Sequence, residues 1–215
     1  MAKTEETEGR ECMQAEQYLK RKERLLISAI RLLDEAGLAG MTTREMARRE
    51  GITEPAVFRH FDGKVEVLQA ILNRFSEFDA SLENTVMEND MDPLDAITHI
   101  AEAYAGYYAG YPEIADVMFS MDIWKYDLSL DARMKEIFGN RRNLMRTLVD
   151  KAVMLGKIPG TIDAEAMAGL LSGIVISATQ QWKMQGKSFD LRERVRRMLM
   201  LVLPGKSSVA VWGSP

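Results

Sequence analysis

The segment TEPAVFRHFDGK, residues 53–64, carries side chains that suit contact with a polyanion. Arg59 and Lys64 are cations, and His60 can hydrogen-bond to a phosphate. Glu54 can accept a hydrogen bond from a base edge such as cytosine N4. The segment is short and is flanked by turn residues. It is therefore either a buried helix that happens to carry charge or an exposed helix that contacts nucleic acid.

The elements around this segment favour the exposed helix. Two short helices, expected over residues 43–50 and 54–60, are separated only by the tripeptide GIT. A pair of this kind is a helix-turn-helix, and it places its second helix in the major groove of DNA. Thr42 and Glu45 stand three residues apart as in a capping box, which predicts the start of the first helix.

The whole chain is predicted to be all-α. Apolar residues recur at helical spacing in one segment after another, and no segment shows sustained alternation. Helix-start signals support the boundaries, for example Pro93 after Asp92. We expect nine helices, over residues 16–36, 43–50, 54–60, 63–88, 93–110, 112–122, 129–156, 163–185 and 190–203.

The charge distribution is uneven along the chain. The 215 residues carry a formal net charge of −4, which does not by itself indicate nucleic acid. Between Gln17 and Phe75, however, eleven Lys or Arg residues face eight Asp or Glu residues, a net charge of +3. The cluster KRKER, residues 20–24, contributes to this excess, although a solvated helix start explains that cluster equally well. The segment has a modest electrostatic footprint for phosphate.

Several other classes of protein fit poorly. Two histidines and one cysteine lack metal-ligand spacing, so we expect no metal, no cofactor and no enzymatic activity. The single cysteine, Cys12, cannot form a disulfide within the chain, and a cytoplasmic setting is expected. The longest nearly uncharged apolar run, residues 166–179, is shorter than the ~20 residues of a membrane span, so no membrane partner is predicted.

The sequence MTTREMARREGITEPAVFRHFDGKVEVLQAIL resembles the DNA-binding segment of the TetR family of bacterial transcription regulators, from about Leu26 to Leu72. The resemblance implies a three-helix DNA-binding domain followed by a helical bundle for effector binding and dimerisation. Four parts are then expected: a flexible acidic arm over 1–16, the DNA-binding domain over 17–75, the effector and dimerisation domain over 76–204, and a loose tail over 205–215.

The resemblance also assigns DNA contacts. Thr53 would cap the second helix and offer its hydroxyl to a phosphate, and Lys64 would hold a phosphate at the start of the fourth helix. Glu54 would meet a base, or would merely suit the helix dipole. His60 would contact phosphate, or would be a hydrogen-bonded wedge between helices. The expected DNA-binding residues are Thr42, Thr43, Arg44, Thr53, Glu54, Pro55, Ala56, Phe58, Arg59, His60 and Lys64.

One position departs from the family pattern. Members often carry tyrosine where this chain has Phe58, so packing is kept and a hydroxyl contact to phosphate is lost. Lys64 and His60 would then carry more of the backbone contact.

A small-molecule pocket is expected in the second half of the chain. The resemblance implies it, and aromatic and methionine side chains close together in sequence suit an adaptable apolar cavity, although plain core packing accounts for them as well. Such a pocket would bind a mostly apolar or aromatic effector of unknown identity. The candidate lining residues are Tyr104, Tyr107, Tyr108, Tyr111, Phe119, Trp124 and Met145.

A homodimer is expected through the last two helices. The segment AGLLSGIVISA is apolar nearly all round, so one side needs cover from a second subunit. Small residues four apart allow close approach of two backbones. The candidate interface residues are Gly169, Gly173, Ile176, Ser177, Val195, Met198, Leu199 and Val202.

These features predict a regulator that binds a palindromic operator in double-stranded DNA. A repressor released by its effector is the first interpretation. A protein of the same fold controlled by a protein partner, in chromosome organisation or cell division, and a transcriptional activator are the alternatives.

Overall fold

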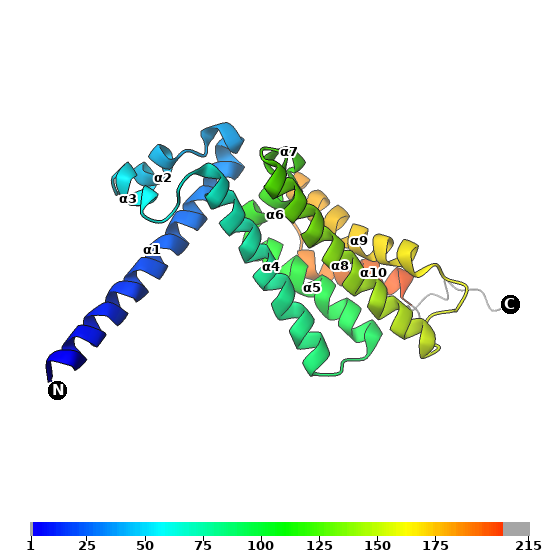
Figure 1. The fold of residues 1–215 in the computed structure, drawn as a ribbon. Helices are drawn as coiled ribbons and strands as arrows, with labels where there is room; N and C mark the ends of the chain where they lie inside the picture. The colour runs from blue at the N-terminus through cyan, green and yellow to red at the C-terminus, as the bar shows by residue number, and fades with distance from the viewer. Residues whose placement is uncertain (1, 204–215) are drawn as a thin grey trace. The chain divides into compact units, whose positions relative to one another are not determined.

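The computed structural model describes the backbone of residues 2–203 and the side chains of residues 20–203 (Figure 1). The expected tail over 205–215 lies outside the described residues. Within them the chain forms ten helices and no strand, which confirms the all-α prediction. No helix among the described residues is long and apolar enough to cross a membrane.

Two compact units make up the chain. The first runs to Arg74 and adds Asp116–Asp131, and the second consists of Phe75–Ala115 and the chain from Ala132 onward. The sequence predicted a division into two domains at residue 75. Residues 116–131, however, had been assigned to the second domain, and the structure groups them with the first unit.

The first unit is built on α1 (Ala2–Gly40), α2 (Thr43–Glu50), α3 (Glu54–Phe58), the start of α4 (Lys64–Glu88) and α7 (Met121–Trp124). Apolar side chains from these helices form its core, because each helix turns one apolar face inward. Fully buried examples are Leu25, Ala29, Met46, Val57, Phe61, Leu68 and Ile71.

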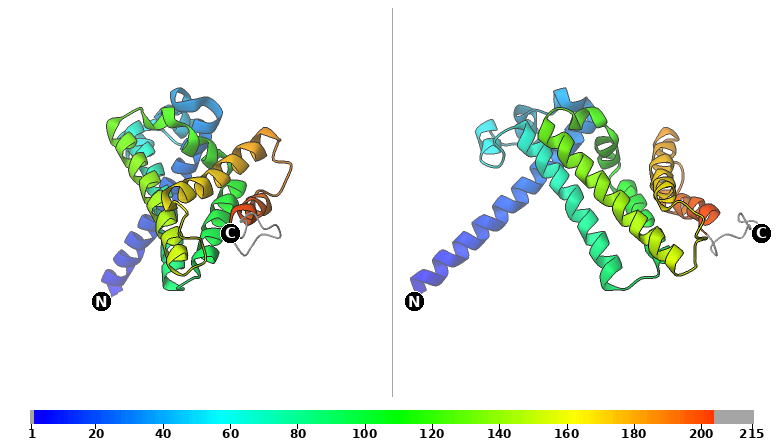
Figure 2. Two further views of the ribbon diagram at one scale, coloured as in Figure 1. Left: turned by 90° about the vertical axis from the view of Figure 1, so that its right-hand side faces the viewer. Right: turned by 45° about the vertical axis from the view of Figure 1, so that its right-hand side comes forward.

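The second unit contains most of α4, α5 (Pro93–Gly110), part of α6 (Pro112–Phe119), most of α8 (Leu128–Met154), α9 (Ala164–Met184) and α10 (Leu191–Val202). Helices α5, α9 and α10 pack against one another, and Figure 2 shows α9 and α10 from two further sides. Aspartates cap three of these helices: Asp92, Asp163 and Asp190 accept hydrogen bonds from backbone N–H groups of the first turn.

Three predicted helices illustrate how the observed boundaries differ from the predictions. Helix α1 begins at Ala2 rather than at residue 16, so the segment expected to be a flexible arm is helical; it contains no proline and many strong helix formers. Helix α3 ends at Phe58 rather than at residue 60, because the following residues form a turn. The helix expected over 112–122 is two helices, since Ser120 has a non-helical conformation.

Candidate nucleic-acid interface

The turn between α2 and α3 has the conformation that a helix-turn-helix needs. Gly51 lies in the left-handed region with φ 64°, and its N–H donates to the carbonyl of Arg48 at 3.4 Å. A side chain at this φ would be strained, so glycine suits the position. At the other end of α2, the Thr42 hydroxyl accepts a hydrogen bond from the Glu45 N–H at 3.1 Å, which is one of the two hydrogen bonds of the predicted capping box. The Glu45 carboxylate binds Arg48.

One face of α3 is exposed and the opposite face is buried. Val57 and the neighbouring Phe61 are 0% and 1% exposed, whereas Phe58 is 48% exposed. Pro55 and Arg59 are exposed on the same side as Phe58, and Ala56 is half-buried. This exposed face lies where a recognition helix would meet base edges and sugars.

Thr53 occupies the N-cap position of α3, but its side chain makes no capping hydrogen bond, contrary to the prediction. The reason lies in the two residues that it would cap. Pro55 has no N–H, and the N–H of Ala56 donates to the Thr53 carbonyl at 2.9 Å. The exposed Thr53 hydroxyl therefore points to a role other than capping, and the predicted phosphate contact is compatible with that.

Glu54 is held by the other helix of the motif. The Thr43 hydroxyl donates a hydrogen bond of 2.5 Å to Glu54 Oε1. The carboxylate keeps a second oxygen and further lone pairs for another donor. The sequence placed both residues at the interface without indicating that they contact each other.

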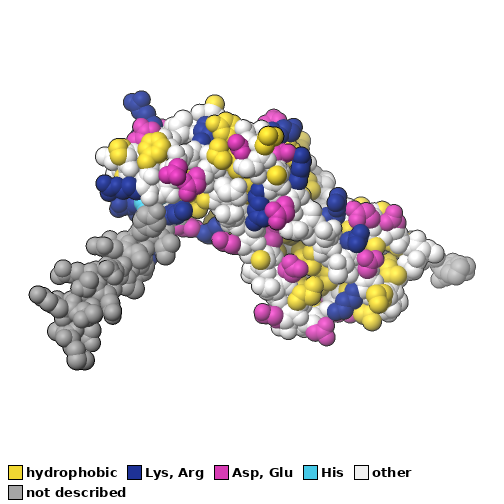
Figure 3. Space-filling model, viewed as in Figure 1, with side chains coloured by type: hydrophobic (Ala, Val, Ile, Leu, Met, Phe, Trp, Pro, Cys, Tyr) yellow, Lys and Arg dark blue, Asp and Glu magenta, His cyan; other side chains and the backbone are white. Residues whose placement is uncertain are grey.

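Two arginines of α2 are engaged by carboxylates on the protein surface. Arg48 donates to Glu45 at 2.9 Å through Nε, and this hydrogen bond keeps the pKa of the Glu45 carboxyl below its ordinary value. Arg49 donates to Glu35 at 3.1 Å through Nη1. Arg44, the predicted DNA contact, is exposed. On the face shown in Figure 3, Lys and Arg side chains are interspersed with Asp and Glu side chains rather than gathered in one large patch.

Lys64 begins α4, as predicted, but its ammonium has partners within the protein. Nζ donates to the Leu38 carbonyl at 2.6 Å and lies 5.7 Å from the centre of the Tyr126 ring. Burial lowers the pKa of this ammonium. A phosphate contact at Lys64 stays a prediction. The ammonium would have to bind the phosphate and the Leu38 carbonyl together, or give up the hydrogen bond to that carbonyl.

His60 is 7% exposed, so it is not among the outward-facing residues. Burial lowers its pKa, and the neighbouring charges of Arg21, Lys22 and Arg59 lower it further. The imidazole is therefore neutral at neutral pH. This placement favours the wedge between helices over the phosphate contact.

Comparison with known proteins agrees with this motif. Residues 25–71 match the family described as "Bacterial regulatory proteins, tetR family". The chain belongs to the TetR family of transcriptional regulators. Its helix-turn-helix is thus that of a family of DNA-binding regulators, as the sequence predicted.

Two proteins of known name and one solved structure are similar to this TetR-family chain. It is 25% identical over 119 residues to the nucleoid occlusion factor SlmA of Aliivibrio fischeri, covering 55% of the chain and 61% of that relative. It is 24% identical over 160 residues to the HTH-type transcriptional regulator SrpR of Pseudomonas putida, covering 72% and 71%. The structure of the regulator FadR from Bacillus subtilis in complex with stearoyl-CoA matches with a TM-score of 0.72 and 17% identity, covering 85% and 98%.

The aromatic residues predicted to line one pocket of the TetR-family chain belong to two different units. Phe119 and Trp124 lie in the first unit, where Trp124 is fully buried and its Nε1 donates to the Val117 carbonyl at 3.1 Å. Tyr104, Tyr107, Tyr108, Tyr111 and Met145 lie in the second unit. Nothing in the sequence indicated that these residues belong to two units, because the boundary between the units lies within the single helix α6.

A part-buried ion pair accompanies the tyrosines of the second unit, and the sequence did not reveal it. Arg141 donates to both carboxylate oxygens of Asp79, at 2.6 and 2.9 Å. The Tyr104 hydroxyl donates to the same carboxylate at 2.8 Å. Burial alone would lower the pKa of the Arg141 guanidinium, but Tyr108, Tyr104 and Asp79 outweigh it and raise that pKa. Burial raises the pKa of the Tyr104 phenol, which therefore stays a hydrogen-bond donor.

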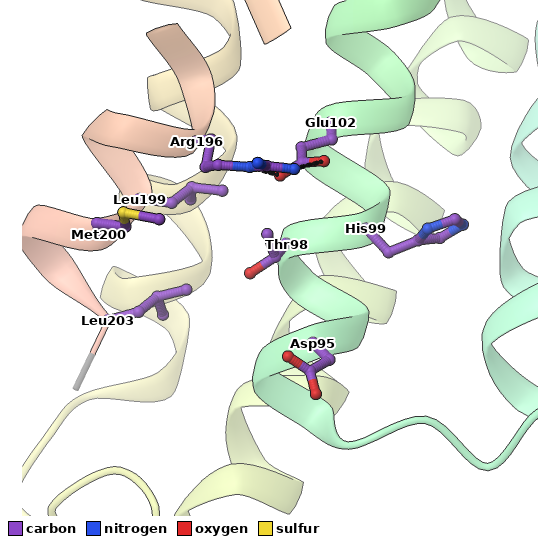
Figure 4. A pocket seen from close by; sticks show the side chains of 8 residues that line it. All are labelled: Asp95, Thr98, His99, Glu102, Arg196, Leu199, Met200 and Leu203. Atoms are coloured by element: carbon purple, nitrogen blue, oxygen red, sulfur yellow. Dashed lines mark hydrogen bonds and ion pairs between the residues drawn. The ribbon is translucent and has the colours of Figure 1, made fainter. Parts of the chain in front are cut away.

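A groove of about 320 Å³ lies between α5 and α10 (Figure 4). The Glu102–Arg196 ion pair, with Nε to Oε1 at 2.7 Å, spans it. None of the tyrosines expected in the effector pocket lines this groove. Its lining residues are Asp95, Thr98, His99, Glu102, Arg196, Leu199, Met200 and Leu203.

The predicted dimer residues also divide into two sets. Gly169 is exposed, and five others are half-buried: Gly173, Ile176, Ser177, Met198 and Val202. Val195 and Leu199 are 0% and 1% exposed within the single chain, so they pack in its own core and cannot form the surface of an interface. The apolar pattern of α10 had combined its core-facing and outward-facing positions in one set.

Proposed function

We propose that this protein is a repressor that binds a palindromic operator as a homodimer and is released by a small, mostly apolar or aromatic effector. The observation that carries the DNA-binding part is the exposed α3 face with Phe58, beside the Thr43–Glu54 hydrogen bond. A dimer of such motifs would contact two half-sites about one helical turn apart, ~34 Å.

The second unit supports the effector part of the proposal. Its aromatic rings pack together, with the stacked rings of Phe78 and Tyr107 centred 4.3 Å apart, and aromatic side chains form adaptable apolar surfaces. The similar FadR structure of Bacillus subtilis contains stearoyl-CoA, a ligand with a long apolar chain. An effector with a long apolar part is therefore consistent with both the chain and this neighbour, whose ligand also carries a charged coenzyme A group.

The DNA part is tested by replacing Lys64 and Glu54. We expect Lys64→Ala to weaken binding to all sequences about equally and to reduce the slope of log affinity against log salt by about 1. We expect Glu54→Ala to relax base preference at one position of each half-site, at a cost of about 1–3 kcal/mol against the preferred base. Fluorescence anisotropy with a selected operator at several salt concentrations measures both effects.

Two controls make this experiment interpretable. Arg197→Ala removes an exposed cation of the second unit that pairs with Glu193, and it is expected to leave DNA binding unchanged. Because Lys64 also binds the Leu38 carbonyl, the melting temperature of each variant is measured alongside. An unchanged salt slope in a folded Lys64→Ala protein would show that Lys64 does not contact phosphate.

The similarity to a nucleoid occlusion factor favours one second candidate, a DNA-binding protein controlled by a protein partner. Operator selection from genomic DNA separates the two. One or a few palindromes beside regulated genes support the repressor, whereas many sites scattered along the chromosome support the alternative.

A further inference from the structure

The part-buried Asp79–Arg141 pair joins three helices of the second unit. Asp79 belongs to α4, Arg141 to α8, and Tyr104 and Tyr108 to α5. The Arg141 and Asp79 side chains are only 14% and 17% exposed. The guanidinium carbon also lies 4.8 Å from the centre of the Tyr104 ring, a cation–π distance.

Stability alone does not account for such a pair. Removing two charges from water is costly, and well-packed apolar side chains of similar size stabilise a core as well or better. Other ion pairs of the second unit are more exposed, such as Arg197 with Glu193, whose side chains are 73% and 43% exposed. A guanidinium placed among aromatic rings therefore calls for a role that an apolar side chain cannot perform.

The surroundings of Arg141 define what else it can bind. Its planar donors match a carboxylate in two parallel hydrogen bonds, which is how it now holds Asp79. Phe138 lies 5.7 Å from the guanidinium, and the rings of Tyr104 and Tyr108 are stacked with centres 6.2 Å apart. A ligand that satisfies both features has an acidic head group and an apolar or aromatic body.

We propose that Arg141 is an anion-binding residue of the regulatory unit, that its ligand is an apolar or aromatic carboxylic acid, and that Asp79 occupies the place of the ligand's carboxylate in its absence. This inference rests on the proposed control by an effector and specifies its chemistry. Tyr104 then serves as a second donor to whichever carboxylate is bound.

Exchange of the two carboxylates has a consequence for α4. When the ligand takes Arg141, Asp79 loses the three hydrogen bonds that hold it, from Arg141 twice and from Tyr104. A buried unpaired carboxylate is unfavourable, so Asp79 must reach water. The C-terminal part of α4 then loses its attachment to α5 and α8, and α4 is the helix that begins at Lys64.

The direction in which one substitution changes the affinity for carboxylates tests the proposal. Asp79→Asn removes the competing charge with little change in size, so we expect affinity for a carboxylate probe to rise tenfold or more. The probes are decanoate and 4-phenylbutyrate, each compared with its uncharged amide, by isothermal titration calorimetry. Affinity for the amides is expected to change by less than about threefold, and Asp79→Ala, which also removes the charge, is expected to show the same gain for the acids.

The control variants separate binding from folding. Asp79→Leu combined with Arg141→Met replaces the pair by apolar side chains, and it is expected to fold and to lose carboxylate binding. Glu102→Gln breaks a second ion pair of the same unit, with Arg196, and is expected to give no gain. A folded Asp79→Asn protein that binds acids no better than wild type, or that gains equally for acids and amides, overturns the inference.

The proposed repressor function and the proposed anion site at Arg141 can be tested independently of each other. If a neutral compound releases the wild-type protein from its operator while Asp79→Asn gains no affinity for acids, control by an effector stands and the role of Arg141 is wrong. If Asp79→Asn gains acid-selective binding while no compound releases the operator, the anion site stands and control by an effector is wrong.

Discussion

His60 shows how burial and charge act together on one side chain. It is almost completely covered, and three cations in its surroundings, Arg21, Lys22 and Arg59, disfavour a further positive charge. The same basic residues that suit DNA phosphate therefore keep this imidazole neutral. If these cations contact phosphate in the proposed complex, DNA binding also changes the protonation equilibrium of His60.

The stability of the protein should depend on pH through His60. Its pKa in the folded chain lies below the ordinary value of 6.5, so the unfolded chain binds more protons between the two values. The contribution of His60 to stability is therefore complete above pH 6.5 and decreases as the pH falls through this window. Urea titrations at pH 8.0, 6.5 and 5.5 measure it.

His60→Gln is the matched control for this pH dependence. The variant has no imidazole to protonate, so its free energy of unfolding is expected to fall less between pH 8.0 and 5.5 than that of the wild type. Equal pH dependence of the two proteins would assign the effect to other groups.

Residue types and spacing indicated some contacts and not others. Thr42 and Glu45 form the predicted cap because both belong to one helix turn, where sequence separation determines distance. The partners of Lys64 and Arg141 are 26 and 62 residues away, at Leu38 and Asp79, and only the folded chain brings them together. No local pattern distinguishes Arg141 from Arg142 beside it.

At the scale of the helices, the turn between α2 and α3 depends on one backbone conformation. Gly51 has φ +64° and nothing within 4 Å of an added Cβ, so a substitution there meets backbone strain and no steric clash. Gly51→Ala is expected to lower the free energy of unfolding by about 1–2 kcal/mol. Circular dichroism during urea titration measures the change.

Gly63 provides the comparison within the same unit. An added Cβ also meets nothing within 4 Å there, and its φ does not lie in the left-handed region. Gly63→Ala is expected to be neutral or slightly stabilising. If both substitutions cost the same, the strain at Gly51 is not what determines the loss.

Apolar spacing was enough to predict where the helices lie. Their ends could be predicted only where a capping residue, a glycine or a proline marks them. Positions such as Leu68 and Ile71 are buried as the period predicts. The early end of α3 and the break at Ser120 had no glycine or proline to signal them, since tertiary packing determines where a short helix stops. The same packing determines which face of α10 enters the core, and this is why Val195 was misassigned.

At the scale of the whole molecule, α9 leaves an apolar surface without cover in a single chain. Leu170 and Met184 are 50% and 87% exposed, and Ile176 is half-buried on the same helix. Gly173 has open space around its Cα, so Gly173→Glu fits the single chain. In the proposed dimer this substitution buries an unpaired charge, so it should yield monomers or aggregates and abolish operator binding.

Analytical ultracentrifugation at micromolar concentration measures this effect. Gly139→Glu on α8 is the control, because an added Cβ there also meets nothing within 4 Å. It is expected to keep the wild-type sedimentation coefficient. A monomeric wild-type protein would contradict the proposed dimer.

The hydrogen bond from Thr43 to Glu54 has a consequence for how operator preference changes by mutation. Because one side chain orients the other across α2 and α3, the effect of replacing Glu54 depends on the residue at position 43. Substitutions at the two positions are therefore epistatic. During evolution, a mutation at Glu54 would have one effect while Thr43 is present and another after Thr43 has been replaced. The order of the two mutations would therefore determine which operator sequences the protein can come to bind.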